Sequence, residues 1–148
     1  MSLELDAGAT EVPGVARDGV WLACIECGHA TPPFDAVRYR CPDCDGLLEV
    51  RYADPPTFEA FDGEGVWRYA AALPFEEGVT LPEGGTPLHE VPRLREEVGI
   101  NRLRVKHEGM NPTGSFKDRG MTVGVRVARE LGVDRLACAS AGNPSAAL

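Results

Sequence analysis

Residues 102–120 read RLRVKHEGMNPTGSFKDRG, and this stretch decides the fold that we expect. Over residues 102–107 basic and less polar side chains alternate, which predicts a strand with one buried face. A loop follows, and then a helix that begins near Lys117, carries one apolar stripe and stops at Gly132. Residues 135–140 are a short apolar run that predicts a second strand. The stretch therefore predicts an α/β fold built on a parallel βαβ unit.

Two loops of this unit are candidates for a binding site. In α/β units of this kind, ligands bind beyond the carboxyl ends of the strands. One such loop leads into Lys117 and the other into Asn143, so we expect these two side chains to face one ligand. The spacing of Gly109 and Gly114 resembles a nucleotide-binding P-loop, but the lysine arrives two positions late. The motif therefore argues against a nucleoside triphosphate.

Lysine is rare in this chain, which makes each lysine informative. The sequence holds 13 arginines but only two lysines, Lys106 and Lys117. Only lysine has a primary amine that can lose its proton and attack a carbonyl. At a helix start, the macrodipole and the neighbouring Arg119 both favour the neutral, nucleophilic amine of Lys117. Such an amine forms a Schiff base with an aldehyde, and pyridoxal phosphate is the commonest aldehyde cofactor; the alternative is a solvated lysine.

Four of the five cysteines form two Cys-x-x-Cys motifs. Cys24 and Cys27 form the first, Cys41 and Cys44 the second, and 13 residues lie between the motifs. Four thiolates in a closed tetrahedral array suit a structural Zn²⁺ ion. A disulfide pair or thioredoxin-like redox chemistry are the alternatives. Cys138 lies in the apolar run near the end of the chain, and we interpret it as a small buried hydrophobic residue.

Charge and composition limit the classes of partner. The net charge of −8 argues against nucleic acid or an anionic membrane as the main partner, since both require positive charge. The low lysine content and the acid excess suit a salt-rich, halophile-like cytoplasm. No apolar run is long enough to cross a bilayer, and the first residues, MSLELDAGATEVPG, lack the apolar core of a secretory signal. We therefore expect a cytoplasmic protein.

The composition changes along the chain and predicts four parts. Residues 1–20 are rich in Gly, Ala and acid and predict a flexible N-terminal arm. Residues 21–52 hold the cysteine motifs between short strand-like runs and predict a zinc-ribbon-like β module. A linker with two adjacent prolines covers residues 53–66. The α/β unit belongs to the last part, residues 67–148.

The motifs together resemble a known family. Residues 106–120 resemble the corresponding stretch of threonine synthase, one of the fold-type II pyridoxal-phosphate enzymes. Residues 83–88 (EGGTPL) and 140–143 (SAGN) resemble the other early motifs of that family in the right order. The cysteine module is similar to the zinc-ribbon-like N-terminal extension of some members, especially archaeal ones. The resemblance covers residues 21–148.

This resemblance implies a reaction and a set of roles. Lys117 is expected to form the Schiff base with pyridoxal phosphate and later to move protons between substrate carbons. Asn143 matches the asparagine that hydrogen-bonds the ring oxygen of the cofactor, and Ser115 and Ser140 lie in loops expected to line the substrate pocket. The implied reaction converts O-phospho-L-homoserine and water to L-threonine and phosphate, in a homodimer when the protein is full-length.

Several alternatives remain at the level of sequence. The family usually has Thr or Ser after the asparagine and Thr two residues before it, where this chain has Pro144 and Ala141. A related fold-type II enzyme, such as a serine/threonine dehydratase or cysteate synthase, is therefore an alternative. Family members are also longer, so we expect a truncated N-terminal fragment that is inactive and partly folded on its own. A non-catalytic zinc-ribbon interaction module is the competing hypothesis.

Overall fold

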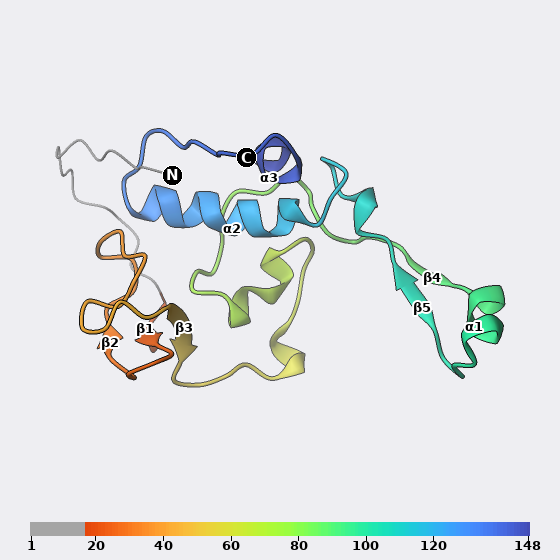
Figure 1. The fold of residues 1–148 in the computed structure, drawn as a ribbon, viewed down its shortest axis with the longest axis horizontal. Helices are drawn as coiled ribbons and strands as arrows, with labels where there is room; N and C mark the ends of the chain where they lie inside the picture. Colours follow the sequence, from red (N-terminus) through yellow and green to blue (C-terminus); the bar gives the residue numbers. More distant parts are fainter. Residues whose placement is uncertain (1–16) are drawn as a thin grey trace.

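The computed structural model describes residues 17–148, so the expected arm over residues 1–20 lies almost wholly outside the described part. Figure 1 shows a small sheet at one side, a long helix above a looped segment, and a hairpin that projects from the other side. No helix within residues 17–148 combines the length and apolar character needed to span a membrane.

The cysteine module is built on a three-stranded antiparallel sheet. Its strands are β1 (Val20–Cys24), β2 (Ala30–Thr31) and β3 (Leu48–Tyr52), with β1 in the middle. The short strand-like runs that we expected around the cysteine motifs include β3. The β1–β3 register places Cys24 opposite Leu48. Because the strands run in opposite directions, the loop that follows β1 lies beside the loop that precedes β3, and each loop carries one cysteine motif.

A looped segment with two 3-10 helices, η1 (Phe58–Ala60) and η2 (Trp67–Ala72), connects the sheet to the rest. Its main anchor is Phe75, which is 2% exposed. The Phe34 ring of the cysteine module lies 5.1 Å from the Phe75 ring, and the Arg126 guanidinium lies 4.3 Å from the same ring. This stack joins the cysteine module to the long helix.

The long helix is α2 (Lys117–Glu130), and the sequence predicted both of its ends. Ala128, one residue of the expected apolar stripe, is buried. Gly132 adopts φ +67°, a left-handed conformation that glycine tolerates without strain, and the Val133 N–H bonds back to the Ala128 carbonyl at 2.9 Å. The short helix α3 (Asn143–Ala147) then packs beside the beginning of α2 (Figure 1).

The expected strand before the helix is present, but its partner and its burial differ from the prediction. It is β5 (Arg104–Lys106), and it pairs antiparallel with β4 (Leu88–Glu90). The helix α1 (Pro92–Val98) connects the two strands along the chain. All residues of both strands are exposed in this projecting hairpin (Figure 1). The prediction of a buried face is therefore wrong for this structure. Alternation of apolar and basic side chains indicates which face of a strand could be buried, but burial also requires another element to pack against that face.

The prediction of a parallel βαβ unit is also wrong for the described residues. Residues 135–140 form no strand, and the described part of the chain contains antiparallel pairs alone. A strand exists only where a neighbouring strand accepts and donates its backbone hydrogen bonds, and β5, the expected partner, is paired with β4. Cys138 is accordingly half-buried rather than buried.

Candidate active site and metal centre

The loop that leads into Lys117 is organised around the carboxylate of Glu108, in the 3-10 helix η3 (Glu108–Met110). Arg119 donates two hydrogen bonds to this carboxylate, from Nε at 2.7 Å and from Nη2 at 3.0 Å. The Thr86 hydroxyl donates a third at 2.6 Å. The hydrogen bonds from Arg119 and Thr86 hold the pKa of Glu108 at about 2, so the carboxylate stays ionised. The first turn of α2 is thereby tied to η3.

Asn111 connects this loop to the EGGTPL motif. Its side-chain amide donates to the backbone carbonyl of Glu108 at 2.8 Å, and its Oδ1 accepts the Gly84 N–H at 2.9 Å. Gly84 adopts φ +93°, and a Cβ atom there would lie 3.1 Å from Arg119 Nη1. Glycine is therefore needed both for the backbone conformation and for the close approach.

A second carboxylate fixes the residues just before Lys117. Asp118 is fully buried and accepts hydrogen bonds from the Thr113 N–H at 2.9 Å and from the Thr113 hydroxyl. Ser115 is 5% exposed, and its Oγ accepts the Lys117 N–H at 3.2 Å. The backbone is therefore held in place on both sides of Lys117.

Lys117 itself is the first residue of α2 and is half-buried. Its Nζ lies 4.8 Å from the centre of the Phe116 ring, and within residues 17–148 it forms no ion pair. The amine is thus available for chemistry. The charge of Arg119, which the sequence analysis placed beside this amine, is largely offset by its bidentate pair with Glu108.

The other candidate residues lie on neighbouring elements. Asn143 is the exposed first residue of α3, and α3 lies beside the end of α2 that carries Lys117 (Figure 1). Ser140 is half-buried, and its Oγ accepts the Gly142 N–H at 3.2 Å. Pro144 occupies the first turn of α3, where a missing N–H removes no helical hydrogen bond.

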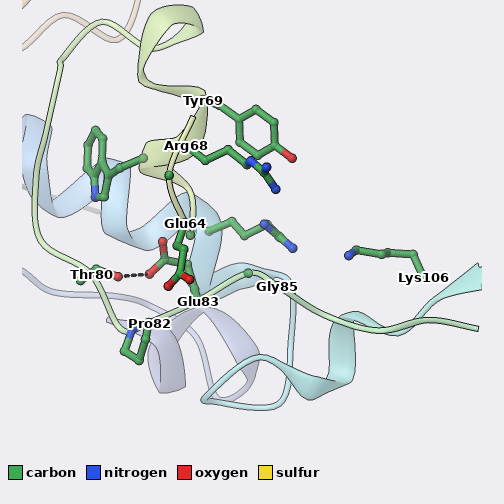
Figure 2. A pocket seen from close by; sticks show the side chains of 13 residues that line it. Glu64, Arg68, Tyr69, Thr80, Pro82, Glu83, Gly85 and Lys106 are labelled. Carbon is green, nitrogen blue, oxygen red and sulfur yellow. Dashed lines mark hydrogen bonds between the residues drawn. The ribbon is translucent and has the colours of Figure 1, made fainter. Parts of the chain in front are cut away.

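A cavity of about 690 Å³ is lined by residues of the looped segment, by Lys106 of β5 and by Arg119 of α2 (Figure 2). Thirteen residues line it, among them the glycines of the EGGTPL motif, but the four candidates Lys117, Asn143, Ser115 and Ser140 are not among them. Sequence reasoning missed this cavity, although the rarity of lysine pointed to one of its residues. Its charged lining residues are Glu64, Arg68, Glu83, Lys106 and Arg119.

Glu83 lines this cavity and is 1% exposed. Burial alone would raise the pKa of its carboxyl group, but hydrogen bonds from the backbone N–H groups of Val66 and Leu81 and from the Thr80 hydroxyl outweigh it and lower the pKa. These three bonds measure 2.8, 2.9 and 2.8 Å. Glu83 is therefore an ionised carboxylate that organises the loop around it.

The four cysteines of the two motifs converge on one point. Their sulfur atoms all lie within 4.8 Å of one another, and all four cysteines are free thiols. The Sγ–Sγ distances are 3.5 Å for Cys24 and Cys44, 3.6 Å for Cys27 and Cys41, and 3.4 Å for Cys27 and Cys44. Four ligands around one ion at the usual zinc–sulfur distance lie roughly 3.8 Å apart. The donor set therefore fits a closed Zn²⁺ site.

Backbone N–H groups favour the ionised form of one thiol in the cluster, that of Cys24. Hydrogen bonds from the backbone N–H groups of Cys27 and Glu26 lower the pKa of Cys24 to about 7. The N–H of Gly46 lowers the pKa of Cys44, but the neighbouring thiols outweigh it and raise that pKa to about 12. This contrast arises because thiols that share one small space cannot all ionise without a cation between them.

Two further residues support the cluster. A Cβ atom at Gly46 would lie 2.8 Å from Cys24 Sγ and 3.2 Å from Cys44 Sγ, so this position must be glycine. His29 Nδ1 lies 2.5 Å from Asp43 Oδ2, which joins the ends of the two motifs. This contact could not be predicted from the sequence, because His29 follows the first motif, Asp43 lies inside the second, and no spacing rule connects them.

Comparison with known proteins agrees with the motifs. Residues 79–148 match the family model of the pyridoxal-phosphate dependent enzymes. The chain is 58% identical to the threonine synthase of Methanosarcina acetivorans over 133 residues, which are 86% of this chain and 33% of that protein. It is 50% identical to the threonine synthase of Methanocaldococcus jannaschii over 135 residues, 84% of this chain and 33% of that protein. With the threonine synthase of Synechocystis it shares 53% identity over 70 residues, 47% of this chain and 18% of that protein.

Residues 79–148 are therefore similar to the pyridoxal-phosphate dependent enzymes, a family named for its cofactor. The resemblance to threonine synthase that the motifs predicted is confirmed, and it extends over most of the chain. The chain spans about a third of the length of these curated relatives. The longer matches include the cysteine module, whereas the Synechocystis match covers about half of the chain.

Proposed function

We propose that this chain is part of a threonine synthase, which converts O-phospho-L-homoserine and water to L-threonine and phosphate, with Lys117 as the residue that binds pyridoxal phosphate covalently. The observation that carries the proposal is the position of Lys117. It begins α2 in a backbone held by Asp118 and Ser115, inside a segment that matches the pyridoxal-phosphate dependent enzymes. The identity of 50–58% to two threonine synthases supports the choice of reaction.

The chain's own residues supply positioning and proton transfer. Pyridoxal phosphate, when bound, supplies the electron sink that makes the hydrogen next to the substrate amino group acidic. Nζ of Lys117, free of ion pairs within residues 17–148, takes and returns protons at the substrate carbons. We assign Asn143, on the neighbouring helix, to the ring oxygen of the cofactor, and Ser115 and Ser140 to the substrate.

We further propose that the cysteine cluster holds a structural zinc ion. The support is the donor set: four free thiols within 4.8 Å of one another, with no fifth position for a substrate. Free thiols of this kind require a reducing compartment, which agrees with the expected cytoplasmic location. The ion would connect the loops after β1 and before β3, and so stabilise a sheet that buries few apolar side chains.

Borohydride reduction in the presence of pyridoxal phosphate, followed by peptide mapping, tests the catalytic part. The chain has only two lysines, so Lys106 serves as an internal control. We expect a pyridoxyl group on Lys117, little on Lys106, and loss of the adduct in Lys117→Arg. Equal labelling of both lysines, or no adduct in a protein that binds zinc, would instead favour the non-catalytic zinc-ribbon module.

A further inference from the structure

The four thiols of the cysteine cluster differ in their access to solvent. Cys24 and Cys41, the first cysteine of each motif, are 4% and 3% exposed. Cys27 and Cys44, the second cysteine of each motif, are both exposed, and we call them the exposed pair. Each motif therefore contributes one buried and one exposed thiol, and a reagent in solution meets the exposed pair first.

The two sulfur atoms of the exposed pair face each other across the motifs. Cys27 Sγ and Cys44 Sγ lie 3.4 Å apart. Within residues 17–148 the hydrogen-bonded Sγ pairs all join one motif to the other; they are Cys24–Cys44, Cys27–Cys41 and Cys27–Cys44. The geometry thus favours a bridge between the motifs over a bridge inside one Cys-x-x-Cys motif, which is the bridge that thioredoxin-like chemistry uses.

Backbone hydrogen bonds fix the turns that carry the exposed pair. The Gly28 N–H donates to the Cys24 carbonyl at 3.0 Å, and this turn encloses the first exposed thiol. The Asp45 N–H donates to the Cys41 carbonyl at 3.0 Å, and this turn encloses the second. Both exposed sulfurs are therefore presented by closed turns whose first residue is a buried cysteine.

The charge around the exposed pair limits the kind of oxidant that can reach it. Glu26, Asp43 and Asp45 are neighbours of the pair in the chain, and all three are exposed. The nearby cations are Arg40, which donates to the Asp45 carbonyl, and His29, which contacts Asp43. Even with His29 protonated, three carboxylates stand against two cations. An anionic oxidant is repelled there, whereas a small neutral hydroperoxide is not.

We propose that Cys27 and Cys44 are an oxidative modification site, at which a hydroperoxide forms a disulfide between the motifs and the zinc ion leaves. One sulfur attacks a peroxide oxygen and breaks the O–O bond, which gives a sulfenic acid and one water. The other sulfur attacks the first and expels the hydroxyl group as a second water. The two sulfurs lose two electrons, which hydrogen peroxide gains, and solvent supplies the two protons that complete the waters.

The disulfide would take over the connection that zinc makes in the reduced protein. With the exposed pair oxidised, Cys24 and Cys41 are the two thiolates left, and a closed zinc site needs four ligands. The new bond joins the loop after β1 to the loop before β3, the same loops that the ion connects. In a reducing compartment such a disulfide is transient and is reversed by thiols, as in redox sensing. This inference rests on the zinc site of the proposed function.

Trypsin separates the two motifs, which makes the connectivity of the disulfide readable. Arg38 and Arg40 lie between the motifs, so digestion places the first motif in residues 18–38 and the second in residues 41–51. We would treat the zinc-loaded protein with hydrogen peroxide, follow zinc release with a colorimetric chelator, alkylate the remaining thiols and map the peptides. We expect the two peptides to be linked, the alkyl label on the two buried cysteines, and one zinc released for each link.

Controls separate this site from general oxidation of thiols. Cys138→Ser removes the remaining cysteine of the chain and should leave the rates of linkage and zinc release unchanged. Oxidised glutathione, which is anionic, should link the peptides at least tenfold more slowly than hydrogen peroxide at the same concentration. A bridge inside one motif, a bridge through the buried cysteines, no linkage, or equal rates with the two oxidants would overturn the inference.

Thermal unfolding tests whether the disulfide takes over from zinc. We expect the oxidised, zinc-free protein to melt about 5 °C or more above the reduced, zinc-free protein, because the new bond restrains the unfolded chain. An equal or lower melting temperature would reject this part of the inference.

The zinc site of the proposed function fails or holds independently of the disulfide. Motifs that become linked in a protein that cannot be loaded with zinc would refute the zinc site alone. A zinc-loaded protein that hydrogen peroxide leaves unlinked would refute the inference alone. The borohydride adduct on Lys117 tests the proposed reaction and involves none of these thiols.

Discussion

Replacing Glu108 with glutamine tests the network that fixes the loop before Lys117. The Glu108 carboxylate accepts hydrogen bonds from Arg119, Thr86 and Asn111, with distances between 2.6 and 3.1 Å. Glutamine of the same shape keeps one acceptor and places an N–H₂ group against the donors of Arg119. The variant therefore loses the ion pair and at least one charged hydrogen bond.

The size of the effect follows from the pKa of Glu108. A decrease from 4.5 to about 2 corresponds to roughly 3 kcal/mol at about 1.4 kcal/mol per pKa unit. The Arg119 and Glu108 side chains are 26% and 27% exposed, so water screens part of this, and we expect Glu108→Gln to lower the free energy of unfolding by about 2 kcal/mol at pH 7.

Urea unfolding at a series of pH values is the assay. Because folding lowers the pKa of Glu108, its contribution is complete above the unfolded value near 4.5 and disappears as the pH falls through the folded value near 2. The difference between the original protein and Glu108→Gln should therefore shrink between pH 4.5 and pH 2. Glu90→Gln, which breaks the exposed pair with Arg104, is the control and should change stability by less than about 0.5 kcal/mol. A difference that stays constant with pH would refute the reasoning.

Three further predictions concern the cysteine cluster and the acidic surface. Cys41→Ser should remove bound zinc and lower the melting temperature, and a chelator should then have no additional effect; retained zinc in the variant would contradict the assignment. Gly46→Ala should reduce the zinc content because its Cβ would lie 2.8 Å from Cys24 Sγ, whereas Gly142→Ala, with nothing within 4 Å, should not. Molar KCl should raise the melting temperature by about 3 °C or more if the acid excess is a salt adaptation, and an unchanged value would reject that hypothesis.

Local signals predicted the parts of the molecule that are determined by neighbours in the chain. The apolar stripe and Gly132 predicted α2, because helix formation depends on residues three and four apart and on a terminal glycine. The spacing of the cysteines predicted one cluster, because each motif turns two thiols toward the same side and four thiols suit one ion. The motifs around Lys117 also predicted the family.

The positions of the other candidate residues needed the structure. The expected roles of Asn143, Ser115 and Ser140 remain predictions: α3 packs beside α2, but none of these three residues lines the cavity of Figure 2. The Glu108–Arg119 pair and the Asn111–Gly84 bond join residues whose partners no periodicity reveals. Such contacts arise from the path of the loops and not from local preference.

The amino-acid sequence by itself predicted the helix α2, the cluster of four cysteines, the rare amine at Lys117 and the enzymes that this chain resembles. Tertiary structure alone decided that β5 pairs with β4 and that residues 135–140 stay without a partner strand. It also decided that Arg68, Lys106 and Arg119 line one cavity. The physical reason is that helix hydrogen bonds and metal motifs close within a few residues, whereas strand pairing and the convergence of distant charges depend on which surfaces meet when the chain folds.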